Sequence, residues 1–324
     1  MHADHQEIAA PPTNDPSGQR RIALVTGGTD GIGKAIARVL AQEGIGVVVV
    51  GSNAEKGAAA VRELRQISGN ADIEFIGADL SLIRNVDILA SEVSKRWPRL
   101  HYLVLCAGIV RGRYTLTSEG IETNFAINYL SRFALTERLL ANLAAQGLAD
   151  QAARILVISG AAQDGKIQYD DVNLTGQFGV VRALSQFCEA NDVFALELAR
   201  RMTAAVPSQN VAVTVLKVGA VRTNIRAQFP TWMKLLVPLV IDPFLSQTPA
   251  QIAASARQLL LDSKFEGVSG ALFRHIKQFK ALKAGPRTSD PAGGRRLWAL
   301  SEQLAAQARA ASASGKTKSV SSSR

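Results

Sequence analysis

The sequence contains few of the residues on which disulfide and metal sites depend. Its 324 residues include only two cysteines, Cys106 and Cys188, and four scattered histidines. Two cysteines exclude a disulfide framework and favour a reducing, cytoplasmic compartment. The histidines have no Cys, Asp or Glu residues near them at metal-ligand spacing, so we expect no metal site.

Long hydrophobic runs are also missing. The longest one, Leu235 to Leu245, is interrupted by Pro238, Asp242 and Pro243. It falls short of the roughly 20 apolar residues that a membrane-spanning helix needs. Residues 1–20 are polar and proline-containing, which predicts a disordered leader and not a signal peptide.

Acidic residues are scarce toward the C-terminus. Of the net charge of +10, residues 264–324 carry 12 basic and 3 acidic groups. No aromatic-interleaved basic groove accompanies them, so we expect no nucleic-acid partner. We expect residues 306–324, rich in Ser, Ala and Lys, to form a disordered basic tail.

A short segment before that tail alternates apolar and basic residues. Its apolar members have helical spacing: Phe273, Ile276, Phe279 and Leu282. This pattern leaves a peripheral membrane contact open. The alternatives are a contact with a second copy, as in a homodimer, and a solvated amphipathic end.

Runs rich in Val and Ile alternate with helical patterns along the chain, which predicts βαβ units. We expect strands at 21–26, 46–51, 73–77, 100–106, 154–159, 211–218 and 271–273. We expect helices at 34–42, 55–67, 86–96, 123–146, 185–204 and 251–261. The prediction is a single doubly wound Rossmann-type α/β domain over residues 21–305. Its parallel sheet has six or seven strands, with helices on both faces.

A glycine-rich loop, Thr26 to Gly33, joins the first strand to its helix. Glycines let the backbone approach a pyrophosphate, and the helix N-terminus supplies N–H groups and positive partial charge. The alternative is a turn that merely packs, but the strand–loop–helix context favours dinucleotide binding.

The end of the second strand bears on the choice of cofactor. An acidic residue there would bind the ribose 2′-hydroxyl and repel a 2′-phosphate, but this chain has Ser52 and Asn53. Both can donate hydrogen bonds to a phosphate, and Lys56 adds charge. NADP(H) is therefore favoured, with NAD(H) left open, and both polar residues could also be simple turn formers.

The chain resembles the short-chain dehydrogenase/reductase family, and its retinol-dehydrogenase-like branch most closely. The resemblance runs from about Arg21 to Leu304 and includes the family's TGxxxGxG loop, Asp79-Leu80 at the adenine, and Cys106-Ala107-Gly108 for its NAG segment. Lys217 to Thr223 resembles the HPGxVxT segment. The resemblance and the loop together imply these cofactor contacts: Gly27, Thr29, Asp30, Gly31, Ile32, Gly33, Ser52, Asn53, Asp79, Leu80, Cys106, Ala107, Gly108, Gly219 and Thr223.

The departures from the family fall on its proton-transfer residues. The alignment places the family's Tyr on Leu184 and its Lys on Cys188, and no YxxxK occurs from Ser159 to Pro207. The family's Ser falls on Gly160, one residue after Ser159. Of this set only Asn128 remains, at the position that holds a water in the family's proton relay.

Three residues are our candidates for catalysis: Asn128, Ser159 and Tyr169. Cys188 could carry a proton if its pKa were lowered, or it could pack as a small hydrophobe. Six further residues could contact a ligand, because they lie near strand ends or in the loop after the Cys106 segment. Each of them could instead be a solvated surface residue: Asp164, Lys166, Lys217, Tyr114, Arg111 and Arg113. The apolar segment Phe229 to Phe244 resembles the family's substrate-covering region, which implies a hydrophobic small-molecule substrate, and ordinary helix packing is the alternative.

Three functions fit this sequence. The first is an NADP(H)-dependent oxidoreductase that acts on a hydrophobic carbonyl or imine through an unusual proton route. The second is a redox-neutral enzyme of the cyclase type in a natural-product pathway. The third is a cofactor-binding pseudoenzyme. The retained cofactor loop favours the first.

Overall fold

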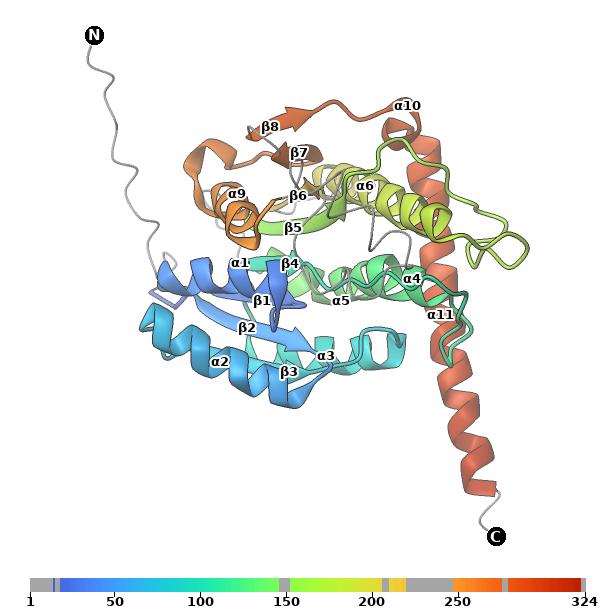
Figure 1. The fold of residues 1–324 in the computed structure, drawn as a ribbon, viewed down its shortest axis with the longest axis horizontal. Helices are drawn as coiled ribbons and strands as arrows, with labels where there is room; N and C mark the ends of the chain where they lie inside the picture. Colours follow the sequence, from blue (N-terminus) through green and yellow to red (C-terminus); the bar gives the residue numbers. More distant parts are fainter. Residues whose placement is uncertain are drawn as a thin grey trace, which may run out of the picture.

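The structure is a computed structural model that describes residue 14 and residues 18–145, 152–205, 210–219, 247–275 and 279–321. Its strands form one sheet in the order β3-β2-β1-β4-β5-β6-β7-β8 (Figure 1). The strands are β1 (Ile22–Thr26), β2 (Gly46–Gly51), β3 (Ile73–Gly77), β4 (Tyr102–Leu105), β5 (Ala153–Gly160), β6 (Val211–Val218), β7 (Ala271–His275) and β8 (Phe279–Leu282).

The predicted doubly wound α/β domain is confirmed, but its sheet has eight strands instead of six or seven. Strands β1 to β7 pair in parallel, and β8 pairs with β7 in the antiparallel direction. The order reverses between β1 and β4, and a doubly wound fold opens its ligand crevice at such a reversal.

The extra strand corrects the interpretation of the basic, apolar segment near the C-terminus. Phe273 and Phe279 do not share a helix, because they lie on the neighbouring strands β7 and β8 and their rings stack 5.4 Å apart. A third ring, Phe265, contacts both of them edge-on. The burial of these three rings against one another outweighs the helical spacing of the sequence.

Helices cover both faces of the sheet. On one face pack α1 (Gly31–Gln42), α2 (Ala54–Ser68) and α9 (Pro249–Leu261). On the other pack α3 (Ile83–Arg96), α5 (Ser131–Ala144) and α6 (Val180–Ala204). Successive strand residues point to opposite faces of the sheet. Leu24 therefore packs under α3, α5 and α6, whereas Val25 packs under α1, α2 and α9. Short elements complete the chain: α4 (Thr123–Phe125), η4 (Ser263–Phe265) and α10 (Pro286–Ser289).

The long helix expected at 123–146 contains a π-helical turn, η1 (Ala126–Leu130), between α4 and α5. Asn128 lies inside this turn. π-Turns widen a helix locally and are frequent at functional sites. The irregularity therefore coincides with Asn128, the residue that the sequence analysis aligned with the family's proton-relay Asn.

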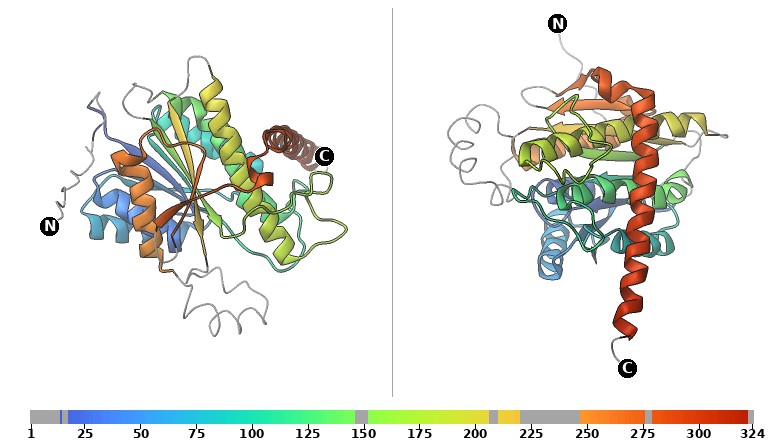
Figure 2. Two further views of the ribbon diagram at one scale, coloured as in Figure 1. Left: turned by 90° about the horizontal axis from the view of Figure 1, so that it is seen from above. Right: turned by 90° about the vertical axis from the view of Figure 1, so that its right-hand side faces the viewer.

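The last helix, α11 (Pro291–Ser321), crosses the outer surfaces of α6, α5 and α3, and its end extends past the body of the domain (Figures 1 and 2). Arg309 donates to both carboxylate oxygens of Asp87 on α3, at 2.8 and 3.0 Å, and Ser312 donates to Glu119 at 2.9 Å. The expected domain end at residue 305 thus falls within a packed helix. No helix within the described ranges is long and apolar enough to cross a membrane.

Candidate functional site

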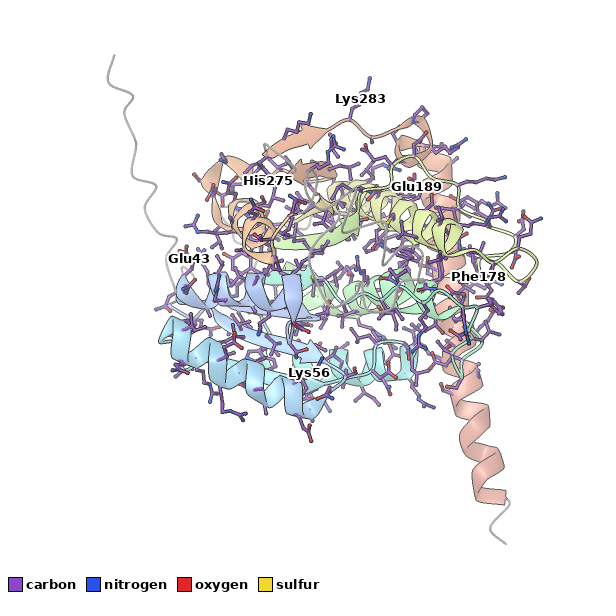
Figure 3. The ribbon with its side chains drawn as sticks, viewed as in Figure 1. Glu43, Lys56, Phe178, Glu189, His275 and Lys283 are labelled. Carbon is purple, nitrogen blue, oxygen red and sulfur yellow. The ribbon has the colours of Figure 1, made fainter. Side chains whose placement is uncertain are left out.

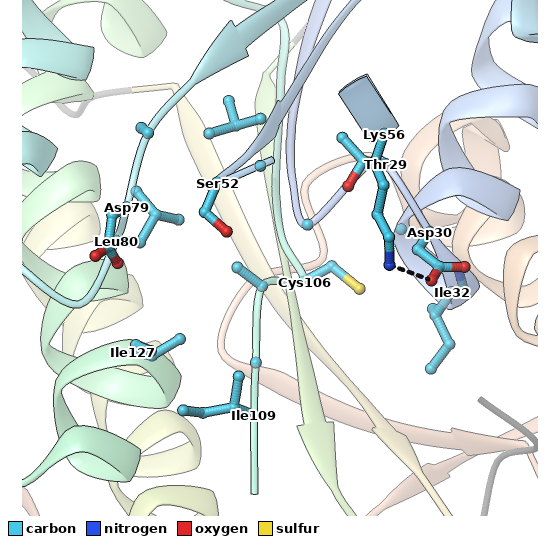
Figure 4. Close-up of a pocket in the computed structure, with 18 residues that line it drawn as sticks. Thr29, Asp30, Ile32, Ser52, Lys56, Asp79, Leu80, Cys106, Ile109 and Ile127 are labelled. Carbon is cyan, nitrogen blue, oxygen red and sulfur yellow. Dashed lines mark hydrogen bonds and ion pairs between the residues drawn. The ribbon is translucent and has the colours of Figure 1, made fainter. Parts of the chain in front are cut away.

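A cavity of about 370 Å³ opens where the strand order reverses, between the loops that follow β1, β2, β3 and β4 (Figure 4). Twelve of the fifteen residues expected to contact a cofactor line it: Gly27, Thr29, Asp30, Gly31, Ile32, Gly33, Ser52, Asp79, Leu80, Cys106, Ala107 and Gly108. Val50, Gly51, Lys56, Ala78, Ile109 and Ile127 complete the wall. The structure therefore brings together residues from positions 27 to 127 of the chain.

The glycine-rich loop is packed so closely that side chains would not fit. A Cβ atom at Gly27 would lie 2.8 Å from the Cα atom of Ala107, and one at Gly33 would lie 2.2 Å from the Gly27 carbonyl oxygen. Gly27 also has a φ of +68°, which disfavours other residues. This cradle leaves the N-terminus of α1 open to the cavity, so the residues present fit a dinucleotide pyrophosphate.

Two charged side chains face each other at the rim of this cradle. Asp30 caps α1 by accepting the Gly31 N–H at 2.7 Å, and its other carboxylate oxygen lies 4.0 Å from Lys56 Nζ (Figure 4). Lys56 lies in α2, beside the end of β2, where Ser52 also lines the cavity. The Asn53 side chain instead caps α2 by accepting the Lys56 N–H at 2.8 Å, and Asn53 does not line the cavity.

The wall formed by Cys106, Ala107 and Gly108 is held from both sides. On one side, Thr26 Oγ1 accepts the N–H groups of Cys106 and Ala107 at 3.0 and 3.2 Å. On the other side, Arg132 Nη2 donates to the Ala107 carbonyl at 2.8 Å. Burial raises the pKa of the Cys106 thiol to about 11, although the nearby Arg132 acts in the opposite direction.

Asn128 is anchored beside this wall. Its side chain donates to the Ile109 and Asn124 carbonyls, both at 2.8 Å, and accepts the Ile109 N–H at 3.1 Å. The backbone carbonyl of Asn128 accepts from Asn191 Nδ2 at 2.9 Å. Both hydrogen-bonding ends of the Asn128 amide are therefore used to fix the turn between β4 and α4.

The residues aligned with the family's Ser and Lys lie against each other. Cys188 is fully buried on α6, and its sulfur would lie 2.7 Å from a Cβ atom added to Gly160. Burial raises the pKa of Cys188 to about 11. Ser159 is buried too, and its hydroxyl donates to the Cys188 carbonyl at 3.4 Å. Leu184, one turn before Cys188, is half-buried against the core.

A buried ion pair lies one helical turn beyond Cys188. Lys217 is paired with Ser159 in the register of β5 and β6, and its ammonium group donates to Asp192 and to the Ala162 carbonyl. Both charged side chains are buried, and burial raises the pKa of Asp192 to about 7. Lys217 is thus not the solvated loop charge that was the alternative for it. Figure 3 labels Glu189, which lies on α6 three residues before Asp192, and Lys56, which lies on α2 on the opposite face of the sheet.

Other candidates lie apart from the cavity. Tyr169 donates to the Gly293 carbonyl at 3.2 Å and stacks under Arg296, so it joins its loop to α11. Asp164 accepts the Arg287 N–H, also away from the cavity. Lys166 is exposed. Gly219 donates to Gln247 at 3.4 Å and does not line the cavity. Thr223 and the segment Phe229 to Phe244 lie outside the described residues.

The loops that follow β4 and β5 meet at their tips. The ring of Tyr114 packs edge-on against Phe178 at 5.7 Å, and Val181 beside it is 65% exposed. Arg111 and Arg113 are exposed on the same loop as Tyr114. This apolar rim with neighbouring cations lies on the loops that leave the carboxyl ends of β4 and β5.

Neither Arg132 nor Asn191 was identified as a site residue from the sequence. Arg132 bonds to Ala107 in the cavity wall, and Asn191 bonds to Asn128. Arg132 follows Asn128 by four residues and therefore shares its helix face, which was the available signal. Asn191 gave no signal, because only the packing of α6 on η1 brings it to Asn128. In the portion of the chain covered by the structure, no cluster of His, Cys, Asp or Glu could hold a metal ion.

Comparison with known proteins agrees with this geometry. Residues 21–170 match the family model described as short chain dehydrogenase. Retinol dehydrogenase 14 from Homo sapiens is 33% identical over 300 residues, which cover 88% of this chain and 86% of that protein. Polyprenol dehydrogenase from Homo sapiens is 28% identical, covering 81% of this chain and 79% of that protein. The solved RhlG/NADP active-site complex from Pseudomonas aeruginosa is 25% identical with a TM-score of 0.63, covering 79% of this chain and 94% of that one.

Proposed function

Because this chain belongs to the short-chain dehydrogenase/reductase family, in its retinol-dehydrogenase-like branch, we propose that it binds a nicotinamide dinucleotide and reduces or oxidises a hydrophobic small molecule. The observation that carries the proposal is the cavity at the sheet reversal, with its closed glycine cradle and open helix N-terminus. The family acts on small-molecule substrates, and solved relatives hold NADP.

The proposed cofactor is NADP(H), with weaker binding of NAD(H). Ser52 and Lys56 line the cavity where a 2′-phosphate would extend from the adenosine ribose, and no acid follows β2 directly. Lys56 also offsets the charge of Asp30 at this rim. Changing Lys56 to Ala should weaken NADPH binding more than NADH binding, and Lys34→Ala, which removes a lysine paired with Glu63, is the matched control.

We propose a substrate that is a hydrophobic carbonyl or an imine, handled without the usual Tyr–Lys pair. When bound, the cofactor supplies or accepts the hydride. Asn128 fixes the turn beside the cavity wall, and the sequence alignment predicts the hydrophobic Leu184 at the position of the family's phenol. A cationic iminium needs no proton donor, so it suits a site with an alkyl side chain at this position.

The test is a turnover screen with NADPH, comparing hydrophobic ketones with preformed iminium compounds. Oxidation of NADPH by an iminium, with ketones inert, supports the proposal. Faster ketone reduction by the wild type than by a Tyr169→Phe variant would identify Tyr169 as the proton donor and overturn the preference for an iminium substrate. We expect the Phe variant to act like the wild type, because Tyr169 contacts α11.

The alternative functions are a redox-neutral cyclase-type enzyme and a cofactor-binding pseudoenzyme. The burial of Cys188 and Ser159 favours them, because neither group faces the described cavity. NADPH binding without turnover of any carbonyl or iminium would select these alternatives. A cytoplasmic location, a homodimer and a peripheral membrane contact stay predictions.

A further inference from the structure

A buried positive charge lies directly behind one wall of the candidate cofactor cavity. The side chain of Arg132 leaves α5 and passes between the carboxyl ends of β4 and β5, and the residue is 5% exposed. Its guanidinium donates to the Ala107 carbonyl at 2.8 Å and to the Ile158 carbonyl at 2.6 Å. A Cβ atom at Gly108 would lie 3.7 Å from Nη2. Only one peptide layer therefore separates this charge from the cavity.

Among the described residues, no carboxylate pairs with this charge. The third acceptor of Arg132 is the neutral amide oxygen of Asn191 at 3.1 Å, and its Nε has no hydrogen-bond partner within the described parts of the chain. Burial lowers the pKa of Arg132 to about 10, so the group stays protonated at neutral pH. The other buried cation of this region, Lys217, is paired with Asp192 and adds little net charge.

The position of Arg132 along the crevice identifies what it faces. In a doubly wound fold the pyrophosphate lies at the N-terminus of α1, and the adenosine extends toward β2 and β3, where Ser52 and Asp79 line the cavity. The nicotinamide then extends the other way, over β4 and β5. Arg132 bonds to the Ala107 carbonyl just after β4 and to the Ile158 carbonyl near the end of β5.

We propose that Arg132 makes the site discriminate between the redox states of its cofactor, favouring the neutral dihydronicotinamide of NADPH over the positively charged ring of NADP⁺. This inference rests on the proposed function. The two forms share every phosphate and ribose, and they differ by one hydride and therefore by one positive charge on the ring. The fixed guanidinium of Arg132 is poorly screened by solvent, so it repels the positively charged ring of NADP⁺ and does not repel the neutral ring of NADPH.

The test compares the dissociation constants of NADPH and NADP⁺ by calorimetric titration. We expect the wild type to bind NADPH about tenfold more tightly, the size of effect that one unit charge gives across roughly 12 Å at an effective dielectric of about 20. Arg132→Met, which keeps the unbranched stem of the side chain and removes its charge, should bring the two constants close together. Arg132→Lys should keep most of the preference. A merely structural Arg132 would weaken both forms equally and leave the ratio unchanged.

Arg154 provides the matched control, since it is a second buried arginine at the opposite end of β5. It donates to the Leu259 and Asp262 carbonyls, and its loss should lower stability without changing the ratio. If Arg132→Met does not fold, Asn191→Asp places a carboxylate against the intact guanidinium and should lower the ratio in the same way. Equal affinities in the wild type, or an unchanged ratio in both variants, would overturn the inference. Failure of both nucleotides to bind would instead contradict the proposed function.

Discussion

The sulfur of Cys188 occupies the space into which any side chain at Gly160 would project, since a Cβ atom built there would approach it to 2.7 Å. The resemblance to the family places its Ser at Gly160 and its Lys at Cys188. The two departures are thus in direct contact. A side chain at 160 therefore requires the Cys188 sulfur to move or to be replaced, so the two positions are coupled through packing.

Restoring the serine alone should therefore destabilise the protein. We expect Gly160→Ser to lower the free energy of unfolding by about 1–3 kcal/mol, the usual cost of overpacking a core. Combining it with Cys188→Ala should recover part of that loss, because the smaller side chain leaves room. Urea unfolding of the four proteins of this double-mutant cycle measures the coupling. A Gly160→Ser protein as stable as the wild type would show that the two positions do not compete for space.

The two cysteines should differ in reactivity. Cys106 lines the cavity, whereas Cys188 is fully buried. Because burial raises the pKa of both thiols to about 11, alkylation should be slow at neutral pH and faster at pH 9. Mass spectrometry should find Cys106 modified and Cys188 intact, and saturating NADPH should slow the modification of Cys106 at least about tenfold. Cys106→Ser is the control, and faster labelling of Cys188 would contradict the site.

Removing either member of the Lys217–Asp192 ion pair should strongly lower the free energy of unfolding. Lys217→Met and Asp192→Asn each leave one buried group without its partner, so we expect losses of about 3–5 kcal/mol in the free energy of unfolding. The double variant should lose less than the sum of the two. The same cycle on the exposed pair Lys34–Glu63 should give a coupling of about 0–1 kcal/mol. Equal coupling energies for the two pairs would contradict the buried character of the first.

Acid should loosen α11. Burial alone would raise the pKa of Asp87, but bonds from Arg309 and Arg138 outweigh it and hold this pKa below 3.8. A depressed carboxyl pKa stabilises the fold above the unfolded pKa and ceases to do so as the pH falls through the folded value. Hydrogen exchange in α11 should therefore speed up below about pH 4 in the wild type.

Arg309→Met tests the same contact at neutral pH. Its partner is partly exposed, so the loss in unfolding free energy should be about 1 kcal/mol and should shrink in high salt. Arg257→Met is the control, since Arg257 on α9 pairs with Glu43 and Asp262 on the opposite face of the sheet. Unchanged exchange in α11 for the Arg309 variant would mean that apolar packing alone holds this helix.

The sequence was sufficient for the architecture and for most of the cavity wall. The Val-rich run at β2 and the glycines at 27 and 33 carry local signals, since strand alternation and tight turns depend on neighbouring residues. β8 was missed because the stacking of Phe273 on Phe279 is a tertiary contact that imitates helical spacing.

The buried charges could not be predicted for a similar reason. Whether Lys217 is solvated or paired depends on Asp192, 25 residues away on another element, and the ammonium of a strand-end lysine has no sequence signature for burial. The contacts of Tyr169 likewise depend on the position of α11, 124 residues further along the chain. Sequence patterns specify elements and loops, whereas the partner of a polar side chain depends on how those elements pack.

The most direct test of the account is a titration of the purified protein with NADPH, with Gly33→Val as the control. The account predicts saturable binding to the wild type at one site per chain. It predicts no detectable binding to the Gly33 variant, whose side chain would collide with the Gly27 carbonyl in the phosphate cradle. Absence of NADPH binding to the folded wild type, or equal binding to both proteins, would contradict it.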